Sequence, residues 1–505
     1  MTPPRKAYLV GGGIASLAAA AFLVRDGGMA GSQITILEAG PVMGGSMAGA
    51  GPLHAADHGA CTRALFQSIP ALGQPGRGLP DDLLAASAPH APTLLVDSRR
   101  AGRPLVSVGF TPQDRQALLQ LVTADEAALG SSCISDHLPP AFFQTAFWCV
   151  WAARSAFQPW HSAVELRRHL HHCMPAFAQA EVPGGSAGGS SGAAPSQHHT
   201  LVLPLQRWLQ GQGVRLLTGC TVTDLDHRGS AGPFEVIAVH CTVHGQPEIR
   251  QLEAGDLVLL QNGSVTDACS LGTAAAPPAR LQTARDGSWA LWEKLATGRP
   301  SFGRPAAFNG CVAQSGCLSF TATLPDTAFA DQLQAFAGLV AGSGGLVAFP
   351  DSNWQLSIAR AQPGWQVVWG QGLCPDRVGN FVPKPMADCS GDELLQELCG
   401  HLRLDPQTVA TAHCIPCRRP YGSSVLMPRA PGDRPLPVPA GTRNFAFIGP
   451  FVEIPLETAT SAEFSVRSAQ LAVHQLLGLA TPEVPDAPQA GPPQARCEAL
   501  VRSLP

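Results

Sequence analysis

Short apolar runs separated by glycines and polar residues open the chain. Tyr8–Val10 is a compact apolar run, Ile14–Val24 is a longer one, and Ile34–Leu37 is again short. Because short runs favour strands and a run of about three turns favours a helix, this order predicts strand, helix and strand. A β-α-β unit of this kind is typical of α/β proteins with a parallel sheet.

Glycines and one acid stand at the turns of this unit. Gly11 and Gly13 follow the first predicted strand, and Glu38 follows the second. Such glycines let the backbone approach a pyrophosphate, and the N–H groups of Ile14 and Ala15 begin the helix that faces it. An acid at the end of the second strand accepts hydrogen bonds from a ribose. The unit therefore predicts dinucleotide binding, with an ordinary glycine turn as the alternative.

Three later segments also contain glycine turns that could contact a cofactor. Gly44–Ser46 follows the acid and favours FAD over NAD, although a plain loop with two glycines is the alternative. The apolar runs Asp256–Leu260 and Asn444–Gly449 each lead into a glycine turn, where a chain can return to a cofactor. The predicted cofactor-binding residues are Gly11, Gly13, Ile14, Ala15, Glu38, Gly44, Gly45, Ser46, Gly263, Ser264 and Gly449.

The rest of the pattern divides the chain into segments. Residues 112–180 are helical in character, and residues 317–370 alternate and are rich in β-type residues. We expect a discontinuous Rossmann-like FAD-binding domain, a second mixed α/β substrate domain with a sheet, a helical insertion that lines the substrate, a flexible Gly/Ser linker and a disordered tail. The FAD-binding domain is assigned to 1–72, 201–300 and 430–480, and the substrate domain to 301–429. The helical insertion is assigned to 112–180, the linker to 183–196 and the tail to 482–505.

Composition narrows the class of protein. A chain of 505 residues needs more than one core, and its net charge of −4 leaves no basic footprint for nucleic acid. Its 15 cysteines follow no regular framework, which favours a reducing cytoplasm over secretion. The run Ile14–Val24 is too short to span a bilayer.

Two polar clusters in the last third of the chain are candidates for a metal site and for a carboxylate-binding site. His413, Cys414 and Cys417 contain one CxxC pair without a second, so no metal site is predicted. Arg418 and Arg419 could attract a substrate carboxylate. A solvated basic pair is the favoured interpretation of these two arginines.

Longer motifs carry a resemblance to a known family. FQPWHSAVELRRHLH, LVLPLQRWLQGQGV and IPCRRPYGSSVLMPR lie at 157–171, 201–214 and 415–429. On these and similar blocks, residues 7–479 resemble the oleate hydratases, the myosin-cross-reactive-antigen family of FAD-containing fatty acid hydratases. The resemblance implies FAD, an unsaturated fatty acid or similar apolar carboxylate as substrate, and a homodimer. It also implies at most a weak contact with a membrane surface, because the chain ends before most of the family's membrane-contacting extension.

The resemblance breaks down at the family's acid–base pair. The glutamate that activates water aligns with His54, and the catalytic tyrosine aligns with His198, while the only tyrosines are Tyr8 and Tyr421. Hydration of a double bond needs an acid and a base, and histidine can serve as either. His54 and His198 are therefore the candidate catalytic residues. The alternatives are a double-bond isomerase or redox flavoenzyme on the same scaffold, and a non-catalytic FAD- or lipid-binding homologue.

Overall fold

The computed structural model describes most of the chain. The described residues are 5–48, 59–71, 74–78, 93–97, 103–104, 107–181, 197–229, 233–280, 287–324, 327–337, 345–360, 366–480 and 493–504. The predicted linker 183–196 and the candidate residue His54 lie outside these ranges.

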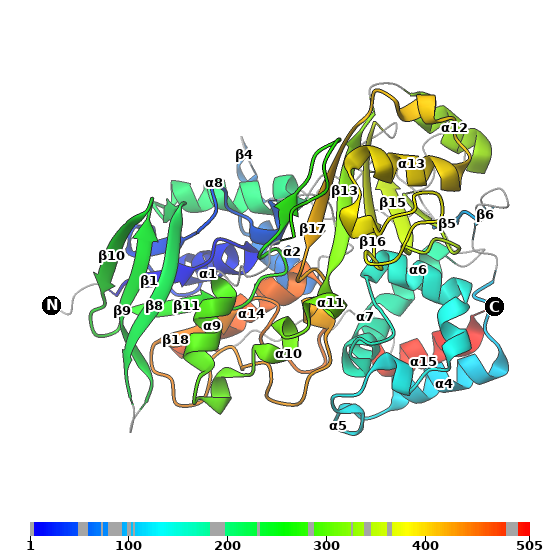
Figure 1. Cartoon of the computed structure of the whole chain (residues 1–505). Coiled ribbons are helices and arrows are strands. Elements are labelled where there is room, and N and C mark those ends of the chain that lie inside the picture. Colours follow the sequence, from blue (N-terminus) through cyan, green and yellow to red (C-terminus); the bar gives the residue numbers. More distant parts are fainter. Residues whose placement is uncertain are drawn as a thin grey trace.

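A five-stranded parallel sheet forms the centre of the first layered unit (Figure 1). Its strand order is β18-β11-β1-β2-β7, so the strand of the N-terminal glycine turn lies in the middle. The strands are β1 (Ala7–Val10), β2 (Ile34–Leu37), β7 (Arg215–Leu217), β11 (Leu257–Gln261) and β18 (Phe445–Ile448). The predicted β-α-β unit is present and belongs to a Rossmann-like α/β fold.

Both faces of this sheet are buried, which explains its nearly continuous apolar strands. On β1, Ala7 and Leu9 pack toward the helices, whereas Tyr8 and Val10 belong to the core on the other face. The helical side holds α1 (Ile14–Arg25), α2 (Ala60–Gln67), α8 (Leu203–Gly211) and α14 (Ala462–Leu477). The other side is covered by the antiparallel sheet of β8 (Cys220–Arg228), β9 (Glu235–Val243) and β10 (Gln246–Gln251), and by α9 (Ser288–Ala296).

A second, eight-stranded sheet lies beside the first unit, in the order β12-β17-β13-β16-β15-β14-β5-β6. Its strands are β12 (Ser270–Leu271), β13 (Cys317–Thr323), β14 (Leu346–Ala348), β15 (Leu356–Arg360), β16 (Val367–Gly372), β17 (His413–Arg419), β5 (Leu94–Leu95) and β6 (Arg103–Pro104). Helices α12 (Ala328–Ala337) and α13 (Gly391–Leu402) cover one face and share its apolar core. The sheet thus combines the predicted β-rich region with strands from two earlier segments and with the later strand β17.

The helical segment is built from α4 (Pro112–Thr123), α5 (Glu126–Leu129), α6 (Ala146–Ser155) and α7 (Ala163–Glu181). Thr111 caps α4 and Ser390 caps α13, each through a reciprocal capping box. Short two-stranded pairing of β3 (Pro70–Ala71) with β4 (Gln74–Gly78) stands apart from both large sheets.

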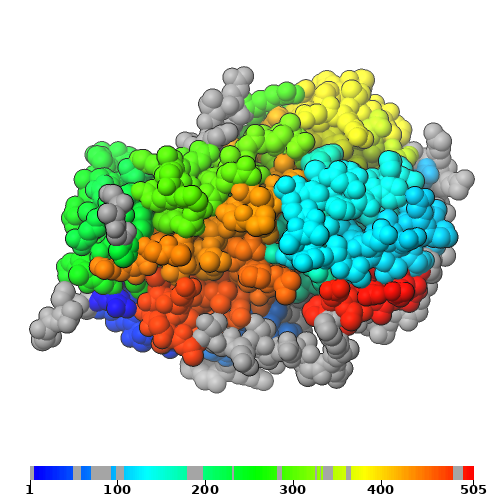
Figure 2. Space-filling view, turned by 90° about the horizontal axis from the view of Figure 1, so that it is seen from below, coloured from blue at the N-terminus to red at the C-terminus, as the bar shows by residue number. Residues whose placement is uncertain are grey.

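One expectation about the C-terminus is wrong. Residues 493–503 form helix α15 (Pro493–Ser503) instead of a disordered tail. Cys497 and Val501 are fully buried in the core shared with α4 and α7, and Arg115 donates to the Val501 carbonyl at 2.6 Å. Figure 2 shows this red segment lying along the cyan helices. The Pro- and Ala-rich composition concealed two apolar residues at helical spacing, which find a partner only in the folded chain.

Candidate functional site

Backbone hydrogen bonds bring the two predicted glycine turns together. Gly11 donates to the Leu37 carbonyl at 2.8 Å, and Gly44 donates to the Gly12 carbonyl at 2.8 Å. Gly11 has φ +94° and Gly44 has φ +120°, conformations that side chains rarely adopt. Gly13 and Gly44 form an isolated parallel bridge. The two loops therefore form one cradle at the carboxyl edge of the sheet.

Glu38 holds this cradle in place. Its carboxylate accepts from the Gly12 N–H at 2.5 Å and from the Gly40 N–H at 2.6 Å. Each oxygen retains a second lone pair, so a ribose hydroxyl can still donate to it. The predicted ribose acceptor is thus also the residue that orders the backbone around the glycines.

The N-terminus of α1 faces the cradle without an internal partner. Gly13 is its N-cap, no side chain caps it, and its first turn contains no acid. The first N–H groups of a helix have no intrahelical acceptor, and the helix dipole favours an anion there. Ile14 and Ala15 begin this helix, and Ser16 is fully buried in it. This end of α1 suits a pyrophosphate.

The side chain of Gln261, the last residue of β11, packs against the glycines of the cradle. A Cβ on Gly13 would lie 2.5 Å from Gln261 Oε1, and one on Gly449 would lie 3.1 Å from Gln261 Cγ. Within the described ranges, the buried Gln261 Oε1 has no hydrogen-bond partner. The sequence analysis did not include Gln261 among the cofactor-binding residues. Its position directly after the apolar run Asp256–Leu260 was the available signal. The glycines, Glu38 and this free acceptor together fit a bound dinucleotide.

Gly263 and Ser264 follow Gln261 in the chain, after Asn262. A Cβ on Gly263 would meet the Phe451 ring at 2.7 Å, and the Ser264 carbonyl accepts from Trp289 Nε1 at 2.9 Å. These two residues therefore pack against an aromatic wall rather than against the glycine cradle. Gly449 (φ +102°) donates to Ser468 Oγ at 2.8 Å, and Ser46 is exposed in the turn after Gly44.

The structure places His198 beside the cradle. It is half-buried at the start of a π-helix (His198–Val202) that leads into α8, and π-helical turns are frequent at functional sites. A Cβ on Gly44 would lie 3.3 Å from His198 Cδ2. The neighbouring His199 is exposed, with its ring centre 5.8 Å from that of His198. Of the two candidate catalytic histidines, His198 is therefore adjacent to a predicted cofactor-binding residue.

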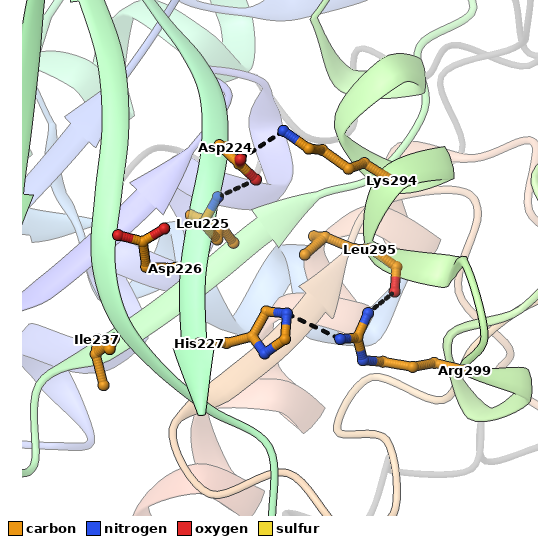
Figure 3. Close-up of a pocket in the computed structure, with 8 residues that line it drawn as sticks. All are labelled: Asp224, Leu225, Asp226, His227, Ile237, Lys294, Leu295 and Arg299. Carbon is orange, nitrogen blue, oxygen red and sulfur yellow. Dashed lines mark hydrogen bonds and ion pairs between the residues drawn. The ribbon is translucent and has the colours of Figure 1, made fainter. Parts of the chain in front are cut away.

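A separate surface hollow of about 440 Å³ lies between β8 and α9 (Figure 3). Its charged side chains already have partners, since Lys294 Nζ donates to Asp224 at 2.5 Å, Arg299 lies 2.8 Å from His227 Nε2 and Asp226 pairs with His240 outside the hollow. None of the predicted site residues lines it. Its open shape and internal pairing give no sign of a ligand.

The described residues form neither a metal site nor a membrane span. Within the ranges that the structure describes, no cluster of three or more His, Cys, Asp and Glu side chains could hold a metal ion. Cys414 and Cys417 lie on opposite faces of β17, opposite Ala322 and Ser319 respectively. Among the described helices, none combines the length and apolar character needed to cross a bilayer.

A buried ion-pair network fixes α7 against the segments around the site. Arg429 Nε lies 3.0 Å and Arg434 Nη1 lies 3.1 Å from Glu165 Oε1. Arg429 Nη1 also lies 3.0 Å from Glu453, and Arg168 Nη2 lies 2.8 Å from the other oxygen of Glu453. Glu165 and Arg168 come from α7, whereas Glu453 follows the Gly449 turn. The network thus joins the helical segment to the late turn beside the cradle.

Electrostatics within this network keep its members charged. Burial alone would raise the pKa of Glu165, but the charges of Arg434 and Arg429 outweigh burial and lower it. Burial lowers the pKa of Arg434 to about 10, which still leaves the guanidinium protonated near neutrality. Glu126 receives a bidentate contact from Arg168 at 2.6 and 2.9 Å, and this holds the pKa of Glu126 below its usual value despite its own burial.

The fold and the site define an α/β protein with a Rossmann-like dinucleotide cradle. The overall fold is shared with cyclohexylamine oxidase from Brevibacterium oxydans IH-35A, with a TM-score of 0.55 at 13% identity. That likeness covers 94% of this chain and 99% of the oxidase.

The particular family follows from sequence comparison. The chain belongs to the MCRA family, whose family model matches residues 4–474. It is 32% identical to an oleate hydratase of Streptococcus pyogenes serotype M49 (strain NZ131), over 94% of this chain and 85% of the relative. It is 27% identical to a linoleate hydratase of Lactiplantibacillus plantarum, over 94% of each. The resemblance drawn from the motifs is confirmed.

Removal of the Glu165 charge should destabilise the protein strongly. Glu165→Gln leaves the Arg429 and Arg434 guanidiniums without their shared counter-charge, a loss typically worth roughly 3–5 kcal/mol for a buried pair. We expect a large fall in the urea midpoint of unfolding at pH 7. The matched control is Glu498→Gln, which removes a more exposed pair with Arg502 on α15 and should change stability by less than about 1 kcal/mol.

The same variant should change the dependence of stability on pH. Because the folded pKa of Glu165 is lowered, its contribution is complete above its ordinary value of 4.5 and is lost as pH falls through the folded pKa. The difference between wild type and Glu165→Gln should therefore shrink as the pH falls below about 4.5. A constant difference across that range would show that the Glu165 charge is not the stabilising feature.

Proposed function

We propose that this protein binds FAD and catalyses the redox-neutral addition of water to a double bond of an unsaturated fatty acid. The observation that carries the proposal is the 32% identity to an oleate hydratase over 94% of the chain. The cradle of Gly11, Gly13 and Glu38 supports the cofactor part, because its geometry and free N–H groups suit a pyrophosphate and a ribose.

When bound, FAD would supply a structural or electrostatic contribution and would gain or lose no electrons overall. The residues that would hold it are the two glycine loops, the N-terminus of α1, Glu38 and Gln261. The chain's own residues then orient the acyl chain, exclude bulk water and move two protons. One proton adds to a carbon of the double bond, and another leaves the water that attacks the neighbouring carbon.

His198 and His54 are the proposed proton-transfer groups. Of the two tyrosines, Tyr8 lies within β1, and the Tyr421 ring packs 5.5 Å from that of Trp289. The position of His198 against Gly44 supports its role, because a group there is next to the cofactor cradle. The aligned position of His54 rests on the sequence alone.

A non-catalytic FAD- or lipid-binding protein is the second candidate. The absence of the family's glutamate and tyrosine at the aligned positions favours it. A homodimer, a weak contact with a membrane surface and a cytoplasmic location remain predictions from the resemblance and the composition. The assigned domain limits remain proposals as well.

Purified protein loaded with FAD should add one water to at least one member of a panel of unsaturated fatty acids that includes oleate and linoleate. Mass spectrometry should show the gain of one water, and oxygen from labelled water should enter the product. The flavin spectrum should stay oxidised through anaerobic turnover. Bleaching by the substrate would indicate a redox enzyme, and no product from any acid would favour the non-catalytic candidate.

Gly13→Val should abolish FAD binding, because its side chain would fill the space beside Gln261 that the pyrophosphate needs. The matched control is Gly211→Val, since a Cβ on exposed Gly211 meets nothing within 4 Å. Visible absorbance after FAD saturation and desalting measures the bound cofactor, and circular dichroism reports the fold. A folded Gly13→Val protein with a full complement of FAD would contradict the cradle assignment.

His198→Ala should lower the hydration rate by about 10²–10⁴-fold while FAD binding persists, as expected for loss of a general acid or base. The exposed neighbour supplies the control, and His199→Ala should retain the wild-type rate. Equal rates for His198→Ala and wild type would place the proton transfer on other groups.

A further inference from the structure

The two adjacent arginines at the end of β17 have different environments. Alternation along the strand places Arg418 and Arg419 on opposite faces of the eight-stranded sheet. Arg418 pairs with Leu318, which belongs to the core shared with α13, and it is half-buried. Arg419 pairs with Cys317 on the other face and is only 4% exposed. The interpretation of both arginines as a solvated pair is therefore wrong for Arg419.

The part of the chain that the structure describes supplies no counter-ion to the buried Arg419 guanidinium. Among the residues that the structure describes, Arg419 makes no ion pair, and no acceptor contacts its buried Nη1 atom. A buried arginine without a partner is costly, and natural proteins pair or hydrogen-bond such a charge. By contrast, Arg429 and Arg434 are equally buried and share the carboxylate of Glu165. Arg419 therefore lacks the kind of anionic partner that Glu165 provides to Arg429 and Arg434.

The face that carries Arg419 has further unsatisfied polar groups. Residues opposite each other in an antiparallel sheet share a face, so the register runs from Cys317 to Ser319, Gln371 and Ser357. Gln371 Nε2 donates to the Ala153 carbonyl of α6 at 2.9 Å, so this face is turned toward the helical segment. Within the described ranges, the buried Gln371 Oε1 and Ser357 Oγ have no partner. Such atoms indicate contact with water or with a ligand.

The immediate neighbours of Arg419 are thiols and apolar groups. Cys417 precedes it by two residues on the same face, and Leu271 of β12 lies opposite Cys417. A hydrogen bond from Cys269 lowers the pKa of Cys417, and the charge of Arg419 acts in the same direction against burial. The guanidinium therefore lies beside thiols and small polar side chains, near the exposed Leu271.

Position in the fold connects this face to the cofactor cradle. The segment 262–269 runs directly from Gln261, under the glycine loops, to β12, where Ser270 pairs with Arg418. On this path a Cβ on Gly263 would meet the Phe451 ring, and Trp289 packs against Tyr421, two residues after Arg419. A ligand on this face would thus extend between the dinucleotide cradle and the helical segment.

We propose that Arg419 binds the carboxylate of the fatty acid substrate through its guanidinium. The proposal rests on the function proposed above and specifies its substrate class: a free acid, in preference to an alcohol or ester of the same chain. A planar guanidinium matches a carboxylate with two parallel hydrogen bonds. The apolar surroundings suit the first methylene groups of the chain and strengthen the ion pair by excluding water.

The test compares oleate with oleyl alcohol on FAD-loaded protein, by titration below the concentration at which either aggregates. Wild type should bind oleate more tightly than the alcohol. Arg419→Met should weaken oleate binding by roughly 10- to 100-fold, the loss expected for a charged hydrogen-bonded pair, and leave the alcohol unaffected. Arg419→Lys should retain part of the preference, and Arg418→Met, on the opposite face, should behave as wild type.

Four outcomes for Arg419→Met would overturn the proposal, and a fifth would overturn only the proposed reaction. Equal loss for acid and alcohol in Arg419→Met would show a structural role, and loss of FAD would show that the cofactor is the anion. Unchanged oleate binding together with a raised pKa for alkylation of Cys417 would show that Arg419 only balances that thiolate. Hydration with an unchanged KM in Arg419→Met would refute this proposal alone. Arg419-dependent oleate binding without hydration would refute only the proposed reaction.

Discussion

The shared contact of Glu165 with two arginines is the constraint on which the arrangement of the site depends. A carboxylate with no exposed surface is stable as an anion only if cations replace the water that it has lost. Arg429 and Arg434 do so from a segment that follows β17, and Glu453 extends the network past the Gly449 turn. Because a missing partner would leave a buried charge, the network fixes α7 in one position relative to the cradle.

This constraint also explains the division of the molecule. The dinucleotide cradle is built almost entirely from backbone groups of the parallel sheet, and the proposed substrate face belongs to the second sheet. Charged side chains from the helical segment join the two units, and apolar packing alone would permit small slides between them. Ion pairs with fixed geometry make one position of α7 lower in free energy than slightly shifted positions. This suits a site whose parts come from three segments.

Predictions from the sequence succeeded where the determining contacts are local. The β-α-β unit and the resemblance to the family were readable, because glycine conformation, strand length and an acid at a strand end act within one short segment. Long-range features were not readable. The helix of residues 493–503 depends on burial of Cys497 and Val501 against distant helices, and the position of Gln261 depends on the pairing of β1 with β11. Periodicity within a segment cannot specify either partner.

Arg418 and Arg419 show the same limit at the level of single residues. In sequence they are one basic dipeptide, and the usual state of such a pair is solvated. The strand makes them opposites, since one faces the α13 core and the other lies on the proposed substrate face. The register with β13 places them on opposite faces, and Arg419 is the more buried of the two. Neither arginine has a described counter-ion, and the deeper burial of Arg419 makes that absence more costly for its guanidinium. The unpaired guanidinium calls for an anion, and the fatty acids named for the relatives supply a carboxylate, so the choice of this anion depends on the proposed reaction.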